Sequence, residues 1–203
     1  TAGLVGDTSS ATMTGTQVSA VNGVATFDEL NLLGTPRVNY TLRFTATGLS
    51  SVTAAPLTVL PAAASKFVFV TQPVGGNATH TSLTIQPALQ IRDRFDNIVT
   101  TDSSSIVTAS IVGDGGALEG GETATSNSGI VSFSEIIVAG TPGIDYKLVF
   151  TATIEGVTIT SAESSAFRVI HGAADQILVT RQAAGAKAGL AFTTQPRITR
   201  SEE

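Results

Sequence analysis

The sequence predicts an all-β chain of tandem Greek-key β-sandwiches, and three observations lead to this fold class. Only 13% of the 203 residues are charged, while β-branched residues and glycine are abundant, which suits pleated strands joined by turns. Apolar and polar residues alternate with period two in short stretches separated by turn signals. The chain also repeats itself with a period of about 109 residues, a usual size for one sandwich.

Composition excludes several function classes. A net charge of -5 with 11 unclustered basic residues argues against a nucleic-acid partner, since phosphate binding depends on Lys and Arg. The absence of cysteine removes disulfides and thiolate metal sites, and two histidines leave little for zinc or general-base chemistry. No apolar run is long enough to span a membrane. We therefore expect no cofactor, no membrane insertion and no enzymatic activity.

Three alignments define the repeat, with offsets of 107, 106 and 109 residues. They pair "TAGLVGD" at 1–7 with "TASIVGD" at 108–114, "NGVATF…RFTAT" at 22–47 with "SGIVSF…VFTAT" at 128–153, and "KFVFVTQ…TIQP" at 66–87 with "DQILVTRQ…TTQP" at 175–196. The alignments predict one complete copy between two partial ones.

The predicted boundaries follow from the phase of the repeat. Residues 1–62 hold the later strands of a partial copy, 63–171 form the complete copy, and 172–203 hold the first strands of a further partial copy. Together the two partial copies lack only the counterpart of 95–107. The last segment and the first therefore come close to making one more domain.

Within the complete copy, the first strands follow from alternation and turn residues. "LTIQPALQI" predicts one strand face bearing Leu83, Ile85, Pro87, Leu89 and Ile91, and the proline requires a bulge, a break or an edge position. "DRFDN" at 93–97 predicts a turn and "SIVTASIV" at 105–112 the next strand. A glycine-rich loop at 113–122 follows, and "SNSG" then turns into the strand stretch "IVSFSEIIV".

The later strands carry the largest side chains. "DYKLVFTAT" places Tyr146, Leu148, Phe150 and Ala152 on one face, and "NYTLRFTAT" repeats this arrangement in the first copy. "AFRVI" closes the unit with Phe167 and Val169 inward. Tyr146 stands where sandwiches often place a tyrosine whose hydroxyl bonds backbone at the preceding turn; a half-buried strand tyrosine is the alternative.

This order of strands and turns resembles the tandem bacterial immunoglobulin-like repeats of large surface and secreted proteins. It is similar in pattern to invasin and intimin repeats and, more broadly, to filamin-type modules. Those families have a D-x-x-G-N turn, where this chain has "DRFDN" with Asp96 at the glycine position. The resemblance implies an extracellular or cell-surface location, prokaryotic in origin, and a structural or adhesive role in stalks, spacers and fibres.

A few residues are candidate sites. Asp93, Asp96 and Asn97, with Asp102 nearby, could supply oxygen ligands to Ca²⁺, although Asp and Asn are also ordinary turn residues and the spacing fits no EF-hand. Asn39 and Asn77 each begin a glycosylation sequon.

We expect an extracellular structural repeat module whose partners are neighbouring repeats or copies of itself. In one version the segment is an excerpt of a longer array. In the other, the last strands of one chain complete the first segment of the next by donor-strand complementation. The alternative function is an immunoglobulin-like binding module that recognises glycan or protein through its loops.

Overall fold

The structure is a computed structural model that describes residues 1–6 and 11–201, and every regular element in these ranges is a β-strand, which confirms the all-β prediction. The strands of the N-terminal segment are β1 (Ala2–Val5), β2 (Thr12–Thr14), β3 (Asn31–Leu33), β4 (Asn39–Phe44), β5 (Val52–Thr53) and β6 (Leu57–Thr58). Asp7, at the end of the repeated "TAGLVGD", lies outside the described residues.

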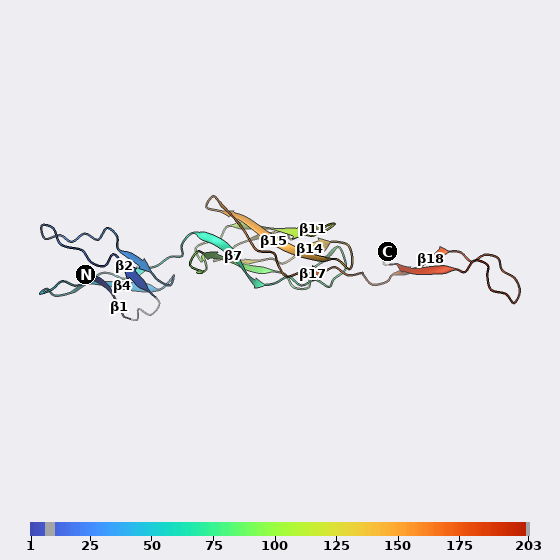
Figure 1. Cartoon of the computed structure of the whole chain (residues 1–203), viewed down its shortest axis with the longest axis horizontal. Coiled ribbons are helices and arrows are strands. Elements are labelled where there is room, and N and C mark those ends of the chain that lie inside the picture. Colours follow the sequence, from blue (N-terminus) through green and yellow to red (C-terminus); the bar gives the residue numbers. More distant parts are fainter. Residues whose placement is uncertain (7–10, 202–203) are drawn as a thin grey trace.

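The central unit contains eleven further strands, and the chain ends in a two-stranded hairpin (Figure 1). The strands of the central unit are β7 (Ala64–Thr71), β8 (Thr81–Ser82), β9 (Ala88–Asp93), β10 (Ile106–Val112), β11 (Ala117–Gly120), β12 (Thr123–Thr125), β13 (Ile130–Ser132), β14 (Ile137–Ala139), β15 (Asp145–Ile154), β16 (Val157–Thr160) and β17 (Phe167–Arg168). The hairpin strands are β18 (Gln176–Arg181) and β19 (Arg197–Ser201).

The central unit has a sandwich-like arrangement of antiparallel sheets. One sheet has the order β12-β10-β15-β16 with β17 on β15, a second has the order β13-β9-β7, and a small third has the order β11-β14-β8. Phe150 of β15 lies between the first two sheets, with its ring centroid 5.7 Å from that of Phe69 on β7 and 4.9 Å from that of Phe133. The main hydrophobic core is built from buried residues between Phe67 and Val169.

Strand β15 shows how the sequence pattern produces this core. Its inward-facing Tyr146, Leu148, Phe150 and Ala152 are all buried, as the alternation predicts, while the residues between them are partly exposed. The predicted last strand is confirmed in the same way, since Phe167 and Val169 are buried on either side of an exposed Arg168.

The structure breaks the alternation through 83–91 at Pro87, which is one of the three predicted outcomes: Pro87 has no N–H to donate, and β9 begins only after it, at Ala88. Two other features differ from the prediction. Ile85, expected on the same strand face as Leu89 and Ile91, is 44% exposed and forms an isolated bridge with Val74. The glycine-rich loop at 113–122 also contains a strand, β11, which pairs with β14 across a bulge.

The N-terminal segment repeats the strand pairing of the central unit. Leu4 of β1 pairs with Leu42 of β4 as Ile111 of β10 pairs with Leu148 of β15, and the neighbouring pairs correspond through the same 107- and 106-residue offsets. The tight turns correspond as well. Gly15 and Gly121 both have φ of +66°, and a Cβ would meet the backbone of Glu29 at the first and of Glu135 at the second, which only glycine avoids.

The predicted tyrosine hydrogen bond is present in both copies. The backbone N–H of Thr141 donates to Tyr146 Oη at 2.9 Å, and that of Thr35 donates to Tyr40 Oη at 2.8 Å. Both rings are buried. Each ring lies against a glycine of the "GTP" turn, Gly34 or Gly140, where a Cβ would come within 2.8 Å of ring carbon atoms. The "GTP…Y" spacing therefore encodes this corner in both segments.

The C-terminal hairpin repeats the pairing of β7 with β9, with one adjustment to the sequence alignment. Ile177 pairs with Arg200 and Val179 with Ile198, as Phe67 pairs with Ile91 and Phe69 with Leu89, and both hairpins shift register at the next position. The offset is therefore 110 residues along β18, not the 109 that the sequence alignment indicates, and 109 along β19.

Candidate functional site: an open apolar face and a matching hairpin

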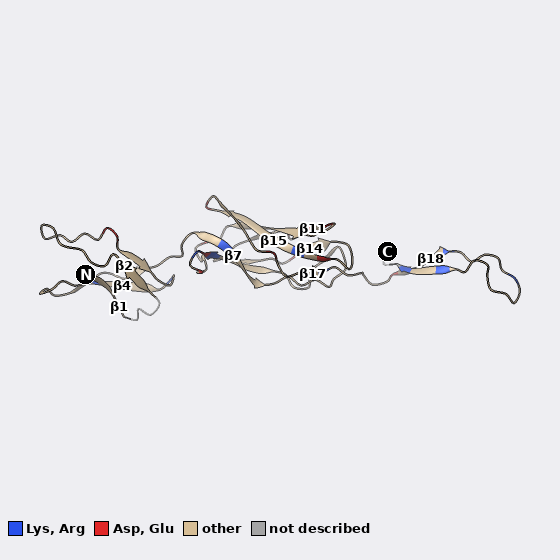
Figure 2. Ribbon diagram, in the orientation of Figure 1, with Lys and Arg blue, Asp and Glu red and all other residues tan. Residues whose placement is uncertain are grey.

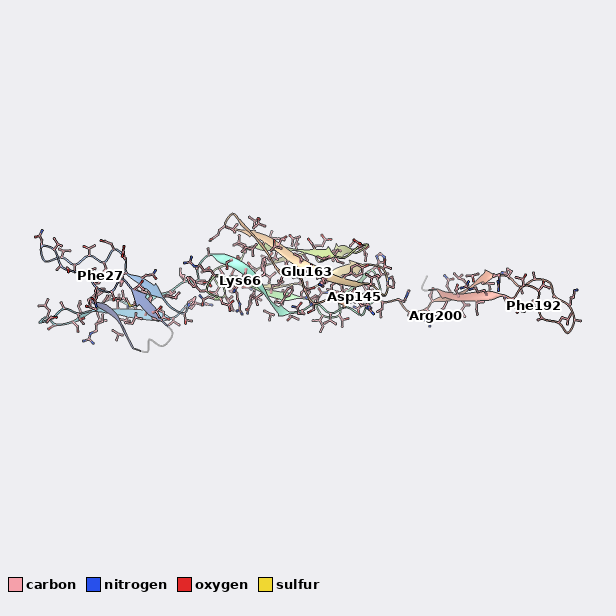
Figure 3. All side chains as sticks on the ribbon, in the orientation of Figure 1. Phe27, Lys66, Asp145, Glu163, Phe192 and Arg200 are labelled. Carbon is pink, nitrogen blue, oxygen red and sulfur yellow. The ribbon has the colours of Figure 1, made fainter. Side chains whose placement is uncertain are left out.

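One side of the N-terminal segment is an open groove of about 280 Å³. On one wall lie Ala25 and Phe27, from the counterpart of β13, and on the other lie Phe44 and Ala46 at the end of β4. Figure 3 labels Phe27 on an arm of the segment that is separate from the arms around β1 and β4. The remaining lining residues are Thr1, Val18, Ala20, Thr45, Leu49, Ser50 and Val52.

The groove occupies the place that β7 and β9 take in the central unit. The Phe27 and Phe44 rings are 5.3 Å apart and tilted, as the corresponding Phe133 and Phe150 rings are. In the central unit Phe69 of β7 covers Phe150 from the other side, and β9 pairs with β13. Neither neighbour has a counterpart among the described strands of 1–62.

Residues of the groove are less buried than their counterparts in the central unit, because the described strands of 1–62 include no counterparts of β7 and β9. Val131 at the centre of β13 is fully buried, whereas its counterpart Ala25 is exposed. Phe150 is fully buried, whereas Phe44 is only half-buried. The N-terminal segment thus exposes backbone and apolar side chains that the central unit covers with two strands.

The hairpin β18–β19 presents the complementary surface. Every residue of β18 is exposed. Ile177 and Val179 correspond to the core-facing Phe67 and Phe69, and Ile198 corresponds to the fully buried Leu89; their exposed fractions are 71%, 51% and 62%. In Figure 1 the hairpin and the N-terminal segment lie at opposite ends of the central unit, so the hairpin does not cover the groove of its own chain.

The hairpin differs from its counterpart in charge. Arg181 and Arg197 stand directly opposite each other where β7 and β9 have Thr71 and Ala88. Arg200 stands at the position of the buried Ile91, and Figure 2 shows basic residues on the hairpin strands. Like charges in directly opposed positions destabilise a strand pair, so this hairpin carries a cost that its counterpart lacks.

The Ca²⁺ candidate Asp93 is buried and surrounded by hydrogen-bond donors. Its Oδ1 accepts from the backbone N–H groups of Phe95 and Asn97, both at 2.9 Å. Its Oδ2 accepts from Ala62 N at 3.0 Å and Asn97 Nδ2 at 3.1 Å. Four donors occupy the approximately four lone-pair sites of a carboxylate, so none is left for a cation. The side chain instead ties the link at Ala62 to the 93–97 turn.

The electrostatics of the turn agree with this geometry. Burial acts to raise the pKa of Asp93, but hydrogen bonds from the Asn97 side chain and from three backbone N–H groups outweigh it and hold the pKa below its ordinary value. Asp96 lies 2.8 Å from Lys66 Nζ and 2.8 Å from Arg92 Nη1, and these cations lower its pKa, Lys66 most strongly. Among the described residues there is no cluster of three or more potential metal-ligating side chains.

Asp102, named with the Ca²⁺ candidates as a nearby carboxylate, forms a second hydrogen-bonded turn. It accepts hydrogen bonds from Ser105 Oγ at 2.5 Å, from Ser126 Oγ, and from the backbone N–H groups of Ser104 and Ser105. Burial acts to raise the pKa of Asp102, but these donors hold it below its ordinary value. Because Ser126 lies 24 residues from Asp102 along the chain, no local motif could have revealed the pair.

The two sequon asparagines lie in different settings. Asn39 is an exposed residue at the start of β4, and its Oδ1 accepts from Thr58 Oγ1 at 2.5 Å. Asn77 is more enclosed: its Nδ2 donates to the Ser82 carbonyl oxygen and its Oδ1 accepts from Thr84 Oγ1 at 2.7 Å. A glycan on Asn77 would take one of its two Nδ2 hydrogens, so only the other could keep the contact with Ser82.

Comparisons with known proteins assign no family or function to this chain. No protein-family model and no curated protein matches this chain. No helix that could cross a membrane occurs in the part of the chain that the structure describes.

Proposed function

We propose that this chain is an immunoglobulin-like structural and adhesive repeat module of an extracellular or cell-surface protein, whose copies join head to tail. The observation that supports this proposal is the register match. Residues 1–62 repeat the pairing of β10 with β15, and β18–β19 repeats the pairing of β7 with β9, so each segment carries what the other lacks. The low charge and the absence of cysteine suit such a module.

The joining step is strand addition. In the central unit β9 pairs with β13 through Leu89 and Val131, and Phe133 N donates to Pro87 O at 3.1 Å. The same register places Ile198 of one copy opposite Ala25 of another and the N–H of Phe27 at Pro196 O. The added backbone hydrogen bonds and the burial of Ile177, Val179 and Ile198 in the groove stabilise the joint.

One residue of the hairpin departs from the core pattern. Arg200 replaces Ile91, whose carbonyl oxygen accepts from Val99 N in the central unit. Val99 belongs to the stretch 95–107, which has no counterpart in either end segment. In a joint of these two segments no described residue takes the place of Val99, so the Arg200 head can remain solvated at this end of the core.

Because the joint uses different surfaces of the two copies, it is heterologous and extends into an open fibre, stalk or surface layer. The alternative of a loop-based glycan binder gains no support from the tyrosines. Tyr40 and Tyr146 are buried and are not available for stacking on a sugar.

The test compares the full chain with a chain truncated after His171, which keeps the whole central core. We expect the full chain to form concentration-dependent oligomers by sedimentation velocity and filaments in negative stain, and the truncated chain to stay monomeric. Hydrogen exchange at 24–27 should slow on assembly. A full chain that stays monomeric with a rapidly exchanging 24–27 segment would overturn the joint and favour a segment completed by another part of a longer polypeptide.

A further inference from the structure

We infer that Arg197 and Asp28 form an ion pair across this joint and act as the residues that select one end segment for the other. The inference rests on the proposed function, since the two residues meet only if β19 of one copy adds beside 24–27 of another. The complementary charges of Arg197 and Asp28 indicate that the occupant of the groove is the hairpin of a second copy of this chain.

The register places the two residues on the same face of the joined sheet. In the central unit Ala88 of β9 pairs with Ser132 of β13. The 109- and 106-residue offsets turn this pair into Arg197 and Thr26. Residues 131–134 alternate buried and exposed, so Ser134 lies on the outer face with Ser132. Its counterpart is Asp28, a diagonal neighbour of Arg197 within reach of a long side chain.

At these positions the two end segments carry residues of opposite charge, where the central unit has neutral ones. The central unit has three neutral residues there, Ala88, Ser132 and Ser134. The corresponding positions of the two end segments hold a cation, Arg197, and an anion, Asp28. Neither charge has a counterpart in the complete copy, so the pair does not follow from ordinary repeat similarity.

Within the hairpin, Arg197 lies opposite another cation, so a nearby anion would stabilise it. Arg181 stands directly opposite Arg197, and the Arg181 Nε–H donates to the Gln195 carbonyl oxygen at 2.8 Å. No salt bridge of either arginine is present among the described contacts. Addition beside Asp28 places a carboxylate next to two cations whose mutual repulsion is otherwise uncompensated.

The pair also discriminates between partners. A hairpin that competes for the central unit's β13 would place Arg197 beside Ser132 and Ser134, with no anion to meet it. The hairpin β7–β9, if it opened, would offer Ala88 to Asp28. The charges thus favour the joint between end segments over exchange with the complete unit, which limits misassembly within an array.

Charge reversal in the full chain tests the inference by sedimentation velocity. We expect Arg197→Asp and Asp28→Arg each to weaken association roughly tenfold, because each replaces an attraction by a repulsion. Arg43→Glu is the matched control, since it reverses an exposed charge on β4, whose counterpart β15 lies in the sheet that the hairpin does not extend, and it should change association by less than about twofold.

Mixing the two reversed variants gives the decisive readout. In the mixture the hairpin of the Arg197→Asp variant brings a carboxylate to the guanidinium introduced by Asp28→Arg. The unaltered Arg197 of the Asp28→Arg variant likewise meets the unaltered Asp28 of the other variant. Both joints are then compensated, so the mixture should assemble as the unaltered chain does, in alternating order. Salt should weaken the unaltered chain more than a chain carrying both Arg197→Ala and Asp28→Ala.

The outcomes separate the two proposals. If the unaltered chain associates but the reversed variants behave like Arg43→Glu, or their mixture shows no recovery, the ion pair is overturned and the joint stands. If the unaltered chain does not associate at any concentration tested, both are overturned.

Discussion

The N-terminal segment and the central unit share strand pairings, turns and the buried tyrosine corner, yet differ in what covers their aromatic residues. Phe150 is enclosed by Phe133 and Phe69, whereas Phe44 has the counterpart of Phe133 and no counterpart of Phe69 within its own segment. The comparison shows that half a sandwich can keep the register of a complete one. What it cannot do alone is remove its apolar face from water.

The largest expected difference lies in this aromatic pair. Phe150→Ala should lower the free energy of unfolding of the central unit by about 3–5 kcal/mol, because it opens a cavity in a closed core. Phe44→Ala should cost clearly less in the unassembled chain, since the groove is already open. Urea titration followed by hydrogen exchange of each segment measures both, and equal losses would contradict the comparison.

A second difference concerns the carboxylate that ties the link to the central unit. Asp93→Asn should destabilise the unit by about 2–3 kcal/mol, because the NH2 group of the amide would face backbone N–H groups that donate hydrogen bonds to the carboxylate. Since the folded pKa of Asp93 is lowered, its stabilisation is present above the ordinary value of 3.8 and is lost as pH falls through the lowered value.

Thermal melts of the unaltered chain and of Asp93→Asn across the acid range check this linkage. The midpoint of the unaltered chain should fall as the pH drops below about 4, and that of the variant should fall less steeply. Asp102 has the same sign of shift, so some acid dependence persists in the variant. Parallel curves would show that the hydrogen bonds to Asp93 contribute nothing through its charge.

The tyrosine corner should make the two regions respond alike. Tyr146→Phe removes the acceptor of Thr141 N, and Tyr40→Phe removes that of Thr35 N, from rings that are buried in both cases. We expect each variant to lose about 1–2 kcal/mol in local stability, read from hydrogen exchange at the "GTP" turn. A large effect in only one segment would mean that the corner depends on the missing strands.

The smallest effect should come from an exposed pair that differs between the segments. Arg168 forms a two-pronged ion pair with Asp145, at 2.7 Å and 3.0 Å, between β17 and β15. The corresponding positions of β4 and β6 hold Asn39 and Thr58, which share a neutral hydrogen bond. The double substitution Asp145→Asn with Arg168→Thr should lower the melting midpoint slightly at low salt and not measurably at high salt, because water and ions screen exposed pairs.

Much of the fold could be predicted because its signals are local. The alternation in "DYKLVFTAT", the turn residues of "DRFDN" and the repeated "GTP…Y" spacing each act within a few residues, so they specify strands, turns and the corner directly. The repeat added the prediction that two partial copies flank a complete one. The same alternation placed Ile85 on one face with Leu89 and Ile91, which was wrong, since the strand breaks at Pro87 and Ile85 is exposed in an isolated bridge with Val74.

Only the tertiary structure decided which residues meet across the chain. The four donors to Asp93 include Ala62, 31 residues away, and the partner Ser126 of Asp102 lies 24 residues away, so neither set has a local pattern. The offset changes from 110 along β18 to 109 along β19 because the connection from Arg181 to its partner Arg197 is one residue shorter than that from Thr71 to Ala88, which only the pairing register shows. Sequence determines which side chains alternate and where the chain turns, because those depend on backbone geometry nearby. Pairing register, burial and the open groove depend on which surfaces exclude water from one another, and that is settled only when the strands come together.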